Sequence, residues 1–403
     1  MERDILHIDM NNCYASIEIK LNPSLKGLPI VVSKSDGENS GIVLAKSQEA
    51  KAFGIKTAET IWQARKKCKD IVIVPPHYDE YKKHSIWARE IYYSYTNQVE
   101  PFGLDEAWLD VTGSKRLFGS SEKIANEIRN RIKNELGITV SVGVSFNKIF
   151  AKLGSDMKKP DAVTVISKEN FKDKVWPLRV DSMIGIGEST KIKLNEIGIF
   201  TLGDLANSRK EDIEKLIGSS GEKIWIQANG LDDSEVRDFY KREDIKSIGH
   251  GNTFTKNLED IEEVRNEFQK LAIAVGNRLI ENNLEAMGIQ IRVRDNNMKT
   301  QSFQETLEYS TFSSIVIRDK ALELFKNYKL INPIRFLEIR AINLTKESNI
   351  QTNLFETFDD AIKKSKIDKA MFDIKSQFGN IITFASLNGK SKNEDLENGE
   401  SQD

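Results

Sequence analysis

Short apolar runs and helical patterns alternate through the first 165 residues, and this alternation constrains the fold more than any other feature. Runs rich in Val and Ile predict strands at Ile5–Asp9, Ile30–Ser33, Ile42–Ala45, Ile71–Val74, Ala107–Val111 and Ile138–Val144. Helical periodicity predicts helices at Cys13–Leu21, Ser47–Phe53, Thr60–Lys67, Glu80–Thr96 and Glu122–Leu136. The pattern predicts an α/β domain whose strands bring distant carboxylates together.

A helical stretch follows at residues 167–238. Within it, Gly185 and Gly187 form a Gly-x-Gly turn, followed by helical patterns at Lys191–Ile197 and Thr201–Ala206. Such a turn points backbone N–H groups outward, which suits a DNA phosphate. A tight connection between two helices is an equally good interpretation of the turn by itself.

Polar residues 240–247 predict a linker, and a second α/β pattern then runs from Ser247 to about Leu344. Strands at Ile289–Arg294 and Gln301–Leu307 flank residues 295–297, which predict a hairpin turn, and Ile339–Leu344 is a further strand. Residues 348–403 are largely polar and end in an acidic stretch that is predicted to be disordered.

Composition excludes several classes of protein. No apolar run of about 18 residues occurs, which predicts no membrane span, and the first residues do not form a signal peptide. Cys13 and Cys68 are the only cysteines, which excludes a disulfide framework and a four-cysteine zinc site. Two reduced thiols are typical of a cytoplasmic protein. The net charge is −2, but the acidic end of the chain offsets basic surface elsewhere.

Three acidic residues stand at the ends of predicted strands. Asp9 ends the first apolar run, and Asp105 and Glu106 immediately precede another. Adjacent acids repel one another, and a divalent cation with oxygen ligands is an obvious compensation. Three carboxylates at one sheet edge are what a two-metal phosphoryl-transfer site requires. From spacing alone, a solvated turn with an unrelated strand-end acid remains the alternative.

Five segments in order resemble the Y-family DNA polymerases, in the DNA polymerase IV and UmuC branch. The first two are Asp9–Glu18 (DMNNCYASIE) and Gly103–Asp110 (GLDEAWLD), which match the family's two catalytic motifs. The third motif is matched by Ser141–Lys148 (SVGVSFNK), which runs on through Ala151–Leu153 to Ser155–Pro160. The fingers segment of the family is similar to Glu49–Ile55, and the entry to its little finger is similar to Lys246–His250. The likeness spans residues 5–345.

The resemblance implies a multidomain α/β fold, the right-hand polymerase with four parts. We expect a palm at residues 1–20 and 77–166, fingers at 21–76, and a helical thumb with a helix-hairpin-helix at 167–238. An α/β little finger is expected at 245–348, followed by a clamp-binding segment and a partly disordered acidic tail at 349–403.

The resemblance also implies the metal ligands. Asp9, Asp105 and Glu106 match the catalytic carboxylates that bind two Mg²⁺ ions, with help from the backbone carbonyl of Met10. The implied reaction is transfer of a deoxynucleotide to a primer 3′-hydroxyl, directed by templates that include damaged ones, with low fidelity. No segment resembles a proofreading exonuclease.

Nucleotide contacts follow from the same motifs. Tyr14 stands where the family places its steric gate, an aromatic ring under the sugar that excludes a 2′-hydroxyl. Lys51 and Lys159 stand where the family contacts the triphosphate of the incoming deoxynucleotide. A half-buried core aromatic and solvated surface lysines are the alternative interpretations of these three residues.

Four positions depart from the DNA polymerase IV pattern. Lys51 replaces a common arginine, so bidentate phosphate contact is lost, and Gln48 replaces a common tyrosine. Cys13 replaces an aromatic residue beside the gate, and Gly103 replaces a serine. The first two lean toward the UmuC-like branch, which leaves the subgroup and any need for UmuD-like subunits open.

Candidate contacts with primer-template DNA lie in the second α/β pattern. Arg292 and Arg294 alternate with apolar residues, so both lie on one face of a strand. By resemblance the little finger binds the DNA backbone there, and Lys246 is a further candidate, with Lys299, Arg335 and Arg340 weaker. A solvated sheet face is the alternative.

A partner is predicted by a short segment beyond the last strand. Gln351, Leu354 and Phe355 resemble the bacterial sliding-clamp-binding pentapeptide, with two spacer residues between the Gln and the Leu. Two adjacent large apolar residues in a polar segment can anchor a peptide in a groove. A local turn packing back on the protein is the alternative.

We therefore predict an error-prone DNA polymerase. A non-catalytic family member that binds DNA and clamp as an adaptor is one rival, and another two-metal enzyme such as a nuclease or cyclase is the second. The intact carboxylate triad argues against the adaptor, and the Gly-x-Gly and little-finger motifs argue against the other enzymes.

Overall fold

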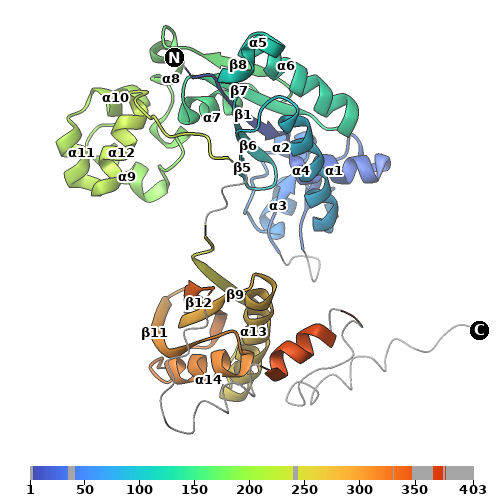
Figure 1. Cartoon of the computed structure of the whole chain (residues 1–403), viewed down its shortest axis with the longest axis vertical. Coiled ribbons are helices and arrows are strands. Elements are labelled where there is room, and N and C mark those ends of the chain that lie inside the picture. The colour runs from blue at the N-terminus through green and yellow to red at the C-terminus, as the bar shows by residue number, and fades with distance from the viewer. Residues whose placement is uncertain are drawn as a thin grey trace, which may run out of the picture. The chain divides into compact units, whose positions relative to one another are not determined.

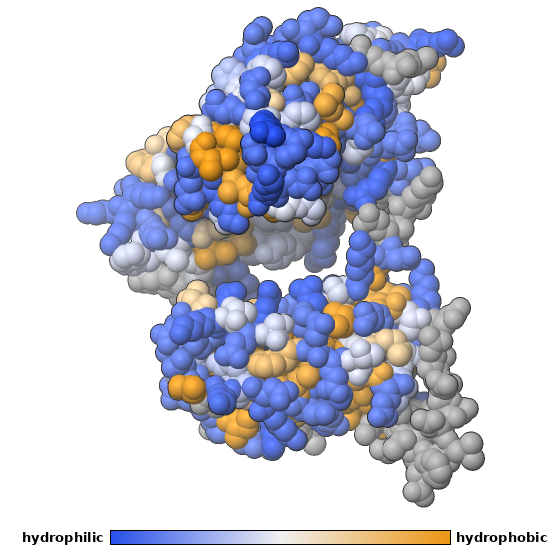
Figure 2. Space-filling view, turned by 90° about the vertical axis from the view of Figure 1, so that its left-hand side faces the viewer, coloured by the Kyte–Doolittle hydropathy of each residue, from blue (hydrophilic) through white to orange (hydrophobic). Residues whose placement is uncertain are grey.

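A computed structural model describes residues 3–34, 41–238, 244–329, 331–346, 366–374 and 377 of the 403-residue chain. The chain divides into two compact units, Met1–Arg242 and Glu243–Asp403, and each is described by itself (Figure 1). Within the described residues, no helix is long and apolar enough to cross a membrane. Hydrophilic residues dominate the face shown in Figure 2, where hydrophobic side chains form small groups among them.

The first unit is built on a five-stranded sheet with the order β5-β6-β1-β7-β8. Its strands are β1 (Ile5–Met10), β5 (Val99–Phe102), β6 (Glu106–Asp110), β7 (Val140–Ser145) and β8 (Val163–Ile166), and only the β7–β8 pair is parallel. Because side chains alternate along a strand, Leu6 and Ile8 lie on one face of β1 and His7 and Asp9 on the other.

Helices cover both faces of this sheet. Leu6 and Ile8 pack in one core cluster with buried residues of α4 (Tyr78–Tyr93) and α6 (Ser121–Arg131). On the opposite face α7 (Lys148–Met157) lies against β7 and β1, where Ser155 contacts His7. The remaining elements of this part are α1 (Cys13–Leu21), α5 (Lys115–Phe118), a 3₁₀ turn at Thr112–Ser114 and a π-helical turn at Ile132–Leu136.

A second, three-stranded sheet lies in the sequence between α1 and α4. Its order is β3-β2-β4, with β2 (Ile30–Val32), β3 (Ala45–Lys46) and β4 (Val72–Val74). It is accompanied by a 3₁₀ turn at Pro23–Leu25 and by α2 (Gln48–Ala52) and α3 (Ile61–Lys67), whose buried residues share a core with Val31.

Helices form the rest of the first unit. They are α8 (Phe171–Val175), α9 (Glu188–Glu196), α10 (Leu202–Asn207), α11 (Lys210–Ile217) and α12 (Ser219–Ala228), with a 3₁₀ turn at Val180–Ser182. Figure 1 shows α9 to α12 gathered into one group. Their core continues into Ile149, Phe150 and Leu153 of α7, which joins this helical group to the sheet.

The second unit is a four-stranded antiparallel sheet with two long helices. The sheet order is β11-β10-β12-β9, with β9 (Ser247–Leu258), β10 (Glu285–Asp295), β11 (Thr300–Thr311) and β12 (Ile334–Thr345). Buried residues of α13 (Ile261–Glu281) and α14 (Ser314–Phe325) share one core with Ile289, Ile291 and Val293 of β10. Residues 366–374 add a further helical segment.

Several predicted boundaries need correction. The strand expected at Ile42–Ala45 is reduced to β3, and Ile42 forms an isolated bridge with Thr60. The single helix expected at Glu122–Leu136 is α-helical only to Arg131 and continues as a π-turn, which leaves Ile132 and Leu136 buried. Ser247, taken as the end of a linker, begins β9, and residues 239–243 lie outside the described residues.

Candidate active site

Strand pairing brings the three predicted carboxylates to one end of the five-stranded sheet. Asp9 lies near the end of β1 and faces Glu106 on β6 in the antiparallel register. The next residue, Met10, donates its N–H to the carbonyl oxygen of Asp105 at 3.0 Å. Gly103 has φ +78°, a conformation that few other residues adopt, and so allows the chain to turn into β6.

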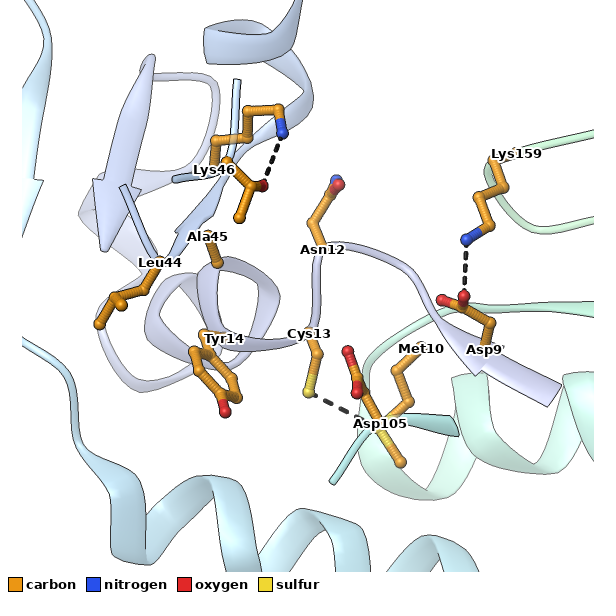
Figure 3. Close-up of a pocket in the computed structure, with 11 residues that line it drawn as sticks. Asp9, Met10, Asn12, Cys13, Tyr14, Leu44, Ala45, Lys46, Asp105 and Lys159 are labelled. Carbon is orange, nitrogen blue, oxygen red and sulfur yellow. Dashed lines mark hydrogen bonds and ion pairs between the residues drawn. The ribbon is translucent and has the colours of Figure 1, made fainter. Parts of the chain in front are cut away.

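A pocket of about 360 Å³ opens beside these acids, and Figure 3 shows the side chains around it. It lies between the ends of β1 and β6 on one side and the three-stranded sheet on the other. Its lining consists of Asp9, Met10, Asn12, Cys13, Tyr14, Leu44, Ala45, Lys46, Thr57, Asp105 and Lys159.

Asp9 is paired with a lysine. Lys159 Nζ lies 2.7 Å from Asp9 Oδ2, the contact drawn in Figure 3, and 2.9 Å from Asp156 Oδ1. Burial raises the pKa of Asp9 above its ordinary value, and Lys159 offsets this only in part. Burial opposes the charge of Lys159 too, but the two carboxylates outweigh it and raise the pKa of Lys159.

Glu106 points its carboxylate to other partners. Its Oε2 lies 3.1 Å from Nε2 of the fully buried His7 and forms an ion pair with Lys152 of α7. Burial alone would raise the pKa of Glu106, but His7 and Lys152 lower it well below the ordinary value. Asp105 has a raised pKa, because it is buried and lies close to the charge of Glu106.

The three acids are therefore neighbours, with two of them held by lysines. In the part of the chain that the structure describes, no three His, Cys, Asp or Glu side chains are arranged as a metal-binding group. Asp9 and Asp105 line the pocket, whereas the carboxylate of Glu106 is turned toward α7. Crowded carboxylates repel one another and need compensating cations. Divalent metal ions that prefer oxygen ligands can provide this compensation.

Tyr14 lies on the first turn of α1 and lines the same pocket. Its ring is stacked on Tyr81 of α4, with centroids 4.1 Å apart and planes 10° apart. Tyr78 meets Tyr14 edge-on at 6.1 Å. Asn12, with φ 48°, turns the chain from β1 into α1 and so places Tyr14 after the carboxylate strand.

Lys46 lines the pocket from the three-stranded sheet, and no sequence motif identified it. Lys46 Nζ donates to Thr57 Oγ1 at 3.0 Å, and burial, then the charge of Lys51, lowers its pKa. Lys51 itself is exposed on α2. Lys46 follows the apolar pair Leu44 and Ala45, and a lysine ending such a run was the available signal.

His7 and Lys152 were also missed. His7 lies two residues before Asp9 on the same face of β1, and its Nδ1 lies 2.8 Å from Ser155 Oγ. The period of two along a strand could have identified His7. Lys152 could not be identified in this way, because its contact depends on how α7 crosses the sheet.

The predicted DNA-contact residues lie in both units. Gly185 has φ +93°, and Gly187 caps the start of α9. A methyl group on either glycine would meet open space, so the turn is free to approach another molecule. Four further candidates, Lys246, Arg292, Arg294 and Arg340, belong to the second unit.

Three arginines of the second unit lie on one face of its sheet. Ile291 and Val293 are fully buried, which confirms that Arg292 and Arg294 occupy the opposite face of β10. Both guanidinium groups lie over the ring of Phe336, at 5.4 and 5.5 Å.

Glu338 on β12 connects this face to a third arginine. It pairs with Arg292 at 2.5 Å and with Arg340 at 2.7 Å, although its side chain is nearly buried. Lys246 is exposed just before β9. The predicted clamp motif, with Gln351, Leu354 and Phe355, lies outside the described residues.

A sheet edge with crowded acids, beside a pocket lined by lysines and an aromatic ring, suits an enzyme that transfers nucleotides, and comparison with known proteins identifies the family. The impB/mucB/samB family model matches residues 8–156, and the model of that family's C-terminal domain matches residues 245–354. A solved Y-family DNA polymerase chimera, Dbh-Dpo4(243-245)-Dbh, matches with a TM-score of 0.75 and 25% identity, over 85% of this chain and all of that chain.

Curated relatives agree with this match. DNA polymerase IV of Acetivibrio thermocellus is 45% identical over 94% of this chain and 96% of its own length. DNA polymerase IV 1 of Bacillus subtilis is 35% identical over 94% and 91%, and DNA polymerase IV of Clostridium kluyveri is 35% identical over 98% and 100%.

The fold and the comparisons thus define a Y-family DNA polymerase. The chain belongs to the impB/mucB/samB family, in its DNA polymerase IV branch, and is a DNA-directed DNA polymerase of translesion synthesis. The leaning toward the UmuC-like branch, based on Lys51 and Gln48, was wrong, because relatives over nearly the whole chain are DNA polymerases IV. Two side chains weigh little against similarity of that extent.

Proposed function

We propose that Asp9, Asp105 and Glu106, with the backbone carbonyl of Met10, hold the divalent ions of this polymerase, two Mg²⁺ in our assignment. The observation that carries the proposal is that the buried Asp9 and the partly buried Asp105 and Glu106 meet at one sheet end, where lysine ammonium groups hold Asp9 and Glu106. All proposed ligands are oxygens, the donors that Mg²⁺ prefers. Burial is the main cause of the raised pKa values of Asp9 and Asp105, so the protein alone disfavours the charged form that a bound cation would stabilise.

Bound there, the ions would acidify the primer 3′-hydroxyl and stabilise the charge of the leaving pyrophosphate. The chain itself contributes position. Asp9 and Asp105 face the pocket in which the nucleotide binds. The β1–β6 pairing fixes the backbone of Asp9, and the hydrogen bond from Met10 N–H to the carbonyl oxygen of Asp105 fixes that of Asp105. Catalysis in this class depends mainly on such positioning and on electrostatics.

Lysines in this pocket bind the triphosphate in our proposal. Lys159 contacts Asp9 and so lies at the end of the pocket where we place the metal ions. Lys46 lines the opposite side of the pocket, which the three-stranded sheet forms. Lys51, exposed nearby on α2, adds positive charge at the margin. Ligand binding requires Lys159 to release Asp9, and Lys152 to release Glu106.

Tyr14 acts as the steric gate in this proposal. Its ring lines the pocket and is backed by Tyr81, so it presents a fixed surface on the side where a sugar would lie. A 2′-hydroxyl would meet that ring, and deoxynucleotides are therefore preferred.

We further propose the four-part division expected from the sequence. The five-stranded sheet falls in the palm (1–20 and 77–166), the three-stranded sheet in the fingers (21–76), and α8–α12 in the thumb (167–238). The four-stranded sheet of the second unit falls in the little finger (245–348). Backbone N–H groups near Gly185 and Gly187 would contact DNA phosphates, and so would the side chains of Lys246, Arg292, Arg294 and Arg340.

Partners follow from this assignment. The polymerase uses template DNA and deoxynucleoside triphosphates, and we propose that Gln351, Leu354 and Phe355 bind the sliding clamp in the cytoplasm. UmuD-like subunits are not part of the proposal, because the relatives belong to the DNA polymerase IV branch. We propose low fidelity without proofreading because the chain belongs to the translesion polymerases and no segment of its sequence resembles a proofreading exonuclease.

Primer extension tests the site. The unchanged protein is expected to extend a primer on an undamaged template with Mg²⁺ and four deoxynucleotides, and Asp105→Ala is expected to lose at least about 10²-fold in rate, since the carboxylate belongs to the charge-stabilising site. Glu127→Ala, an acid on the palm helix α6 that pairs with Lys123, is the matched control and should extend normally.

The outcomes separate three possibilities. Loss of extension only in Asp105→Ala supports the carboxylate site. Extension by Asp105→Ala at the rate of the unchanged protein would show that catalysis lies elsewhere. Retained DNA binding with no extension by any form would favour a non-catalytic adaptor.

A further inference from the structure

Helices α1 and α4 meet directly behind the pocket, and each contributes two side chains to the contact. Tyr14 and Glu18 lie one turn apart on α1, and His77 and Tyr81 lie one turn apart at the start of α4. Residues one turn apart share a helix face. α1 therefore meets Tyr81 at two places, with Tyr14 against the ring and Glu18 against the hydroxyl group.

Tyr81 is held at both ends of its side chain. It is fully buried, its ring is stacked on Tyr14 at 4.1 Å, and its hydroxyl donates to Glu18 Oε1. The same hydroxyl accepts the backbone N–H of His77 at 3.1 Å. With the ring and the hydroxyl both engaged, Tyr81 has one available position.

Glu18 is the buried charge at the centre of this arrangement. Its side chain is 3% exposed and accepts the His77 backbone N–H at 3.3 Å, while Oε2 lies 3.0 Å from His77 Nδ1. His77 precedes α4 and forms no side-chain cap of its own, so Glu18 from α1 satisfies the start of that helix. A carboxylate is favoured at a helix N-terminus.

We propose that Glu18 and Tyr81 are positioning residues for sugar selection, acting through the ring of Tyr14. This inference rests on the proposed role of Tyr14 as the steric gate. One face of the Tyr14 ring is supported by Tyr81, and Tyr78 meets it edge-on. If the Tyr81 hydroxyl loses its acceptor, the supporting ring can tilt, Tyr14 can follow, and room appears for a 2′-hydroxyl. Glu18 itself is not among the residues that line the pocket.

Single-nucleotide insertion measures the effect. The readout is the ratio of kcat/KM for a ribonucleotide to kcat/KM for the matching deoxynucleotide. Glu18→Ala is expected to raise this ratio about tenfold, the scale at which a loosened binding surface loses discrimination. Tyr81→Phe, which removes only the hydroxyl, should raise it as well. Glu18→Gln keeps an oxygen acceptor for Tyr81 and should stay close to the unchanged protein.

Two further variants make the outcomes distinct. Tyr95→Phe removes the hydroxyl of another buried tyrosine, just beyond the end of α4, and should leave the ratio unchanged. Tyr14→Ala tests the gate itself and should raise the ratio most. Melting temperatures are measured for all forms, and if Glu18→Ala does not fold, Tyr81→Phe decides.

An unchanged ratio in Glu18→Ala and Tyr81→Phe, together with a raised ratio in Tyr14→Ala, would overturn the positioning role and leave the gate intact. An equal fall in kcat/KM for both sugars would also overturn it, because that result indicates a structural role alone. If Tyr14→Ala leaves the ratio unchanged, the gate proposal fails, and the inference fails with it.

Discussion

Gly143 on β7 lies directly against the backbone of α7. A Cβ atom there would lie 1.8 Å from the carbonyl oxygen of Ala151 and 2.5 Å from the backbone N of Ser155. These are backbone atoms, which cannot move aside as a side chain can. The close approach places Lys152 against Glu106 and Ser155 against His7.

Gly143→Ala is therefore expected to destabilise the protein by about 2 kcal/mol or more, because overpacking forces backbone shifts. Urea unfolding of the full chain measures the change. Gly113→Ala is the matched control, since a Cβ at Gly113 meets nothing within 4 Å. Equal stability of the two variants would contradict the packing argument.

Cys13 is a second residue whose behaviour follows from its neighbours. Burial, and then the charges of Asp105 and Asp9, raise the pKa of its thiol above the ordinary value. A raised pKa lowers the thiolate fraction, and the thiolate is the reactive form. Cys13 is thus expected to resist iodoacetamide at pH 8 in the folded protein and to react once the chain is unfolded in guanidinium. Rapid labelling of the Cys13 peptide in the folded protein would contradict this.

At this scale, sequence motifs identified residues that line the pocket from β1, from α1, from the turn before β6 and from the loop after α7. Asp9, Tyr14, Asp105 and Lys159 all lie there. What the motifs could not supply were the partners. Glu18 lies inside a recognised motif, yet its contact with Tyr81 depends on how α1 and α4 cross, and this is decided by packing far along the chain.

Elements with strong periodicity were predicted well. The helix at Cys13–Leu21 matches α1, and the strands of the five-stranded sheet other than β5 and β8 lie within a few residues of their predicted places. β5 was missed because Glu100 and Pro101 interrupt its apolar pattern, and Glu100 is instead buried in an ion pair with Lys148. β9 was missed because polar residues and glycines interrupt its apolar pattern, and half of its residues are exposed, as an edge strand permits.

The start of α14 depends on a residue far along the chain. Asp368, which is nearly buried, accepts hydrogen bonds from Ser313 Oγ at 2.6 Å, from Ser314 N at 2.9 Å and from Ser314 Oγ at 2.5 Å. Ser313 precedes the helix but forms no side-chain cap of its own. Asp368 therefore performs that role and fastens residues 366–374 to the second unit.

Asp368→Ala should lower the stability of the second unit by about 1–3 kcal/mol, since buried donors lose their acceptor. Differential scanning calorimetry of the full chain measures this, with Lys369→Ala, an exposed neighbour, as the control. An unchanged transition in Asp368→Ala would show that the segment contributes nothing to folding.

At the scale of the whole molecule, the two units have separate cores. Within the described residues, one core cluster belongs to the second unit and the others belong to the first, with no cluster shared. Since cooperativity follows shared packing, each unit is expected to unfold in its own transition.

A matched pair of core substitutions tests this independence. Ile128→Ala in the first unit and Ile291→Ala in the second both remove fully buried methyl groups, and each should cost about 2–5 kcal/mol. In calorimetry each substitution should lower one transition and leave the other in place. A single transition that falls in both variants would show that the units unfold together.

The contact between Lys159 and Asp9 has a consequence for how ligands influence one another. The ammonium group of Lys159, which pairs with Asp9, is the group that we assign to the triphosphate. The carboxylate of Asp9 and the nucleotide therefore compete for the same positive charge. A nucleotide that takes Lys159 away leaves Asp9 free for a cation, and the two ligands then bind with positive cooperativity. By linkage, the factor by which the nucleotide tightens cation binding equals the factor by which the cation tightens nucleotide binding. Calorimetric titration with Mg²⁺, with and without a non-hydrolysable deoxynucleotide, should show weak cation affinity in the free protein and stronger affinity in the complex.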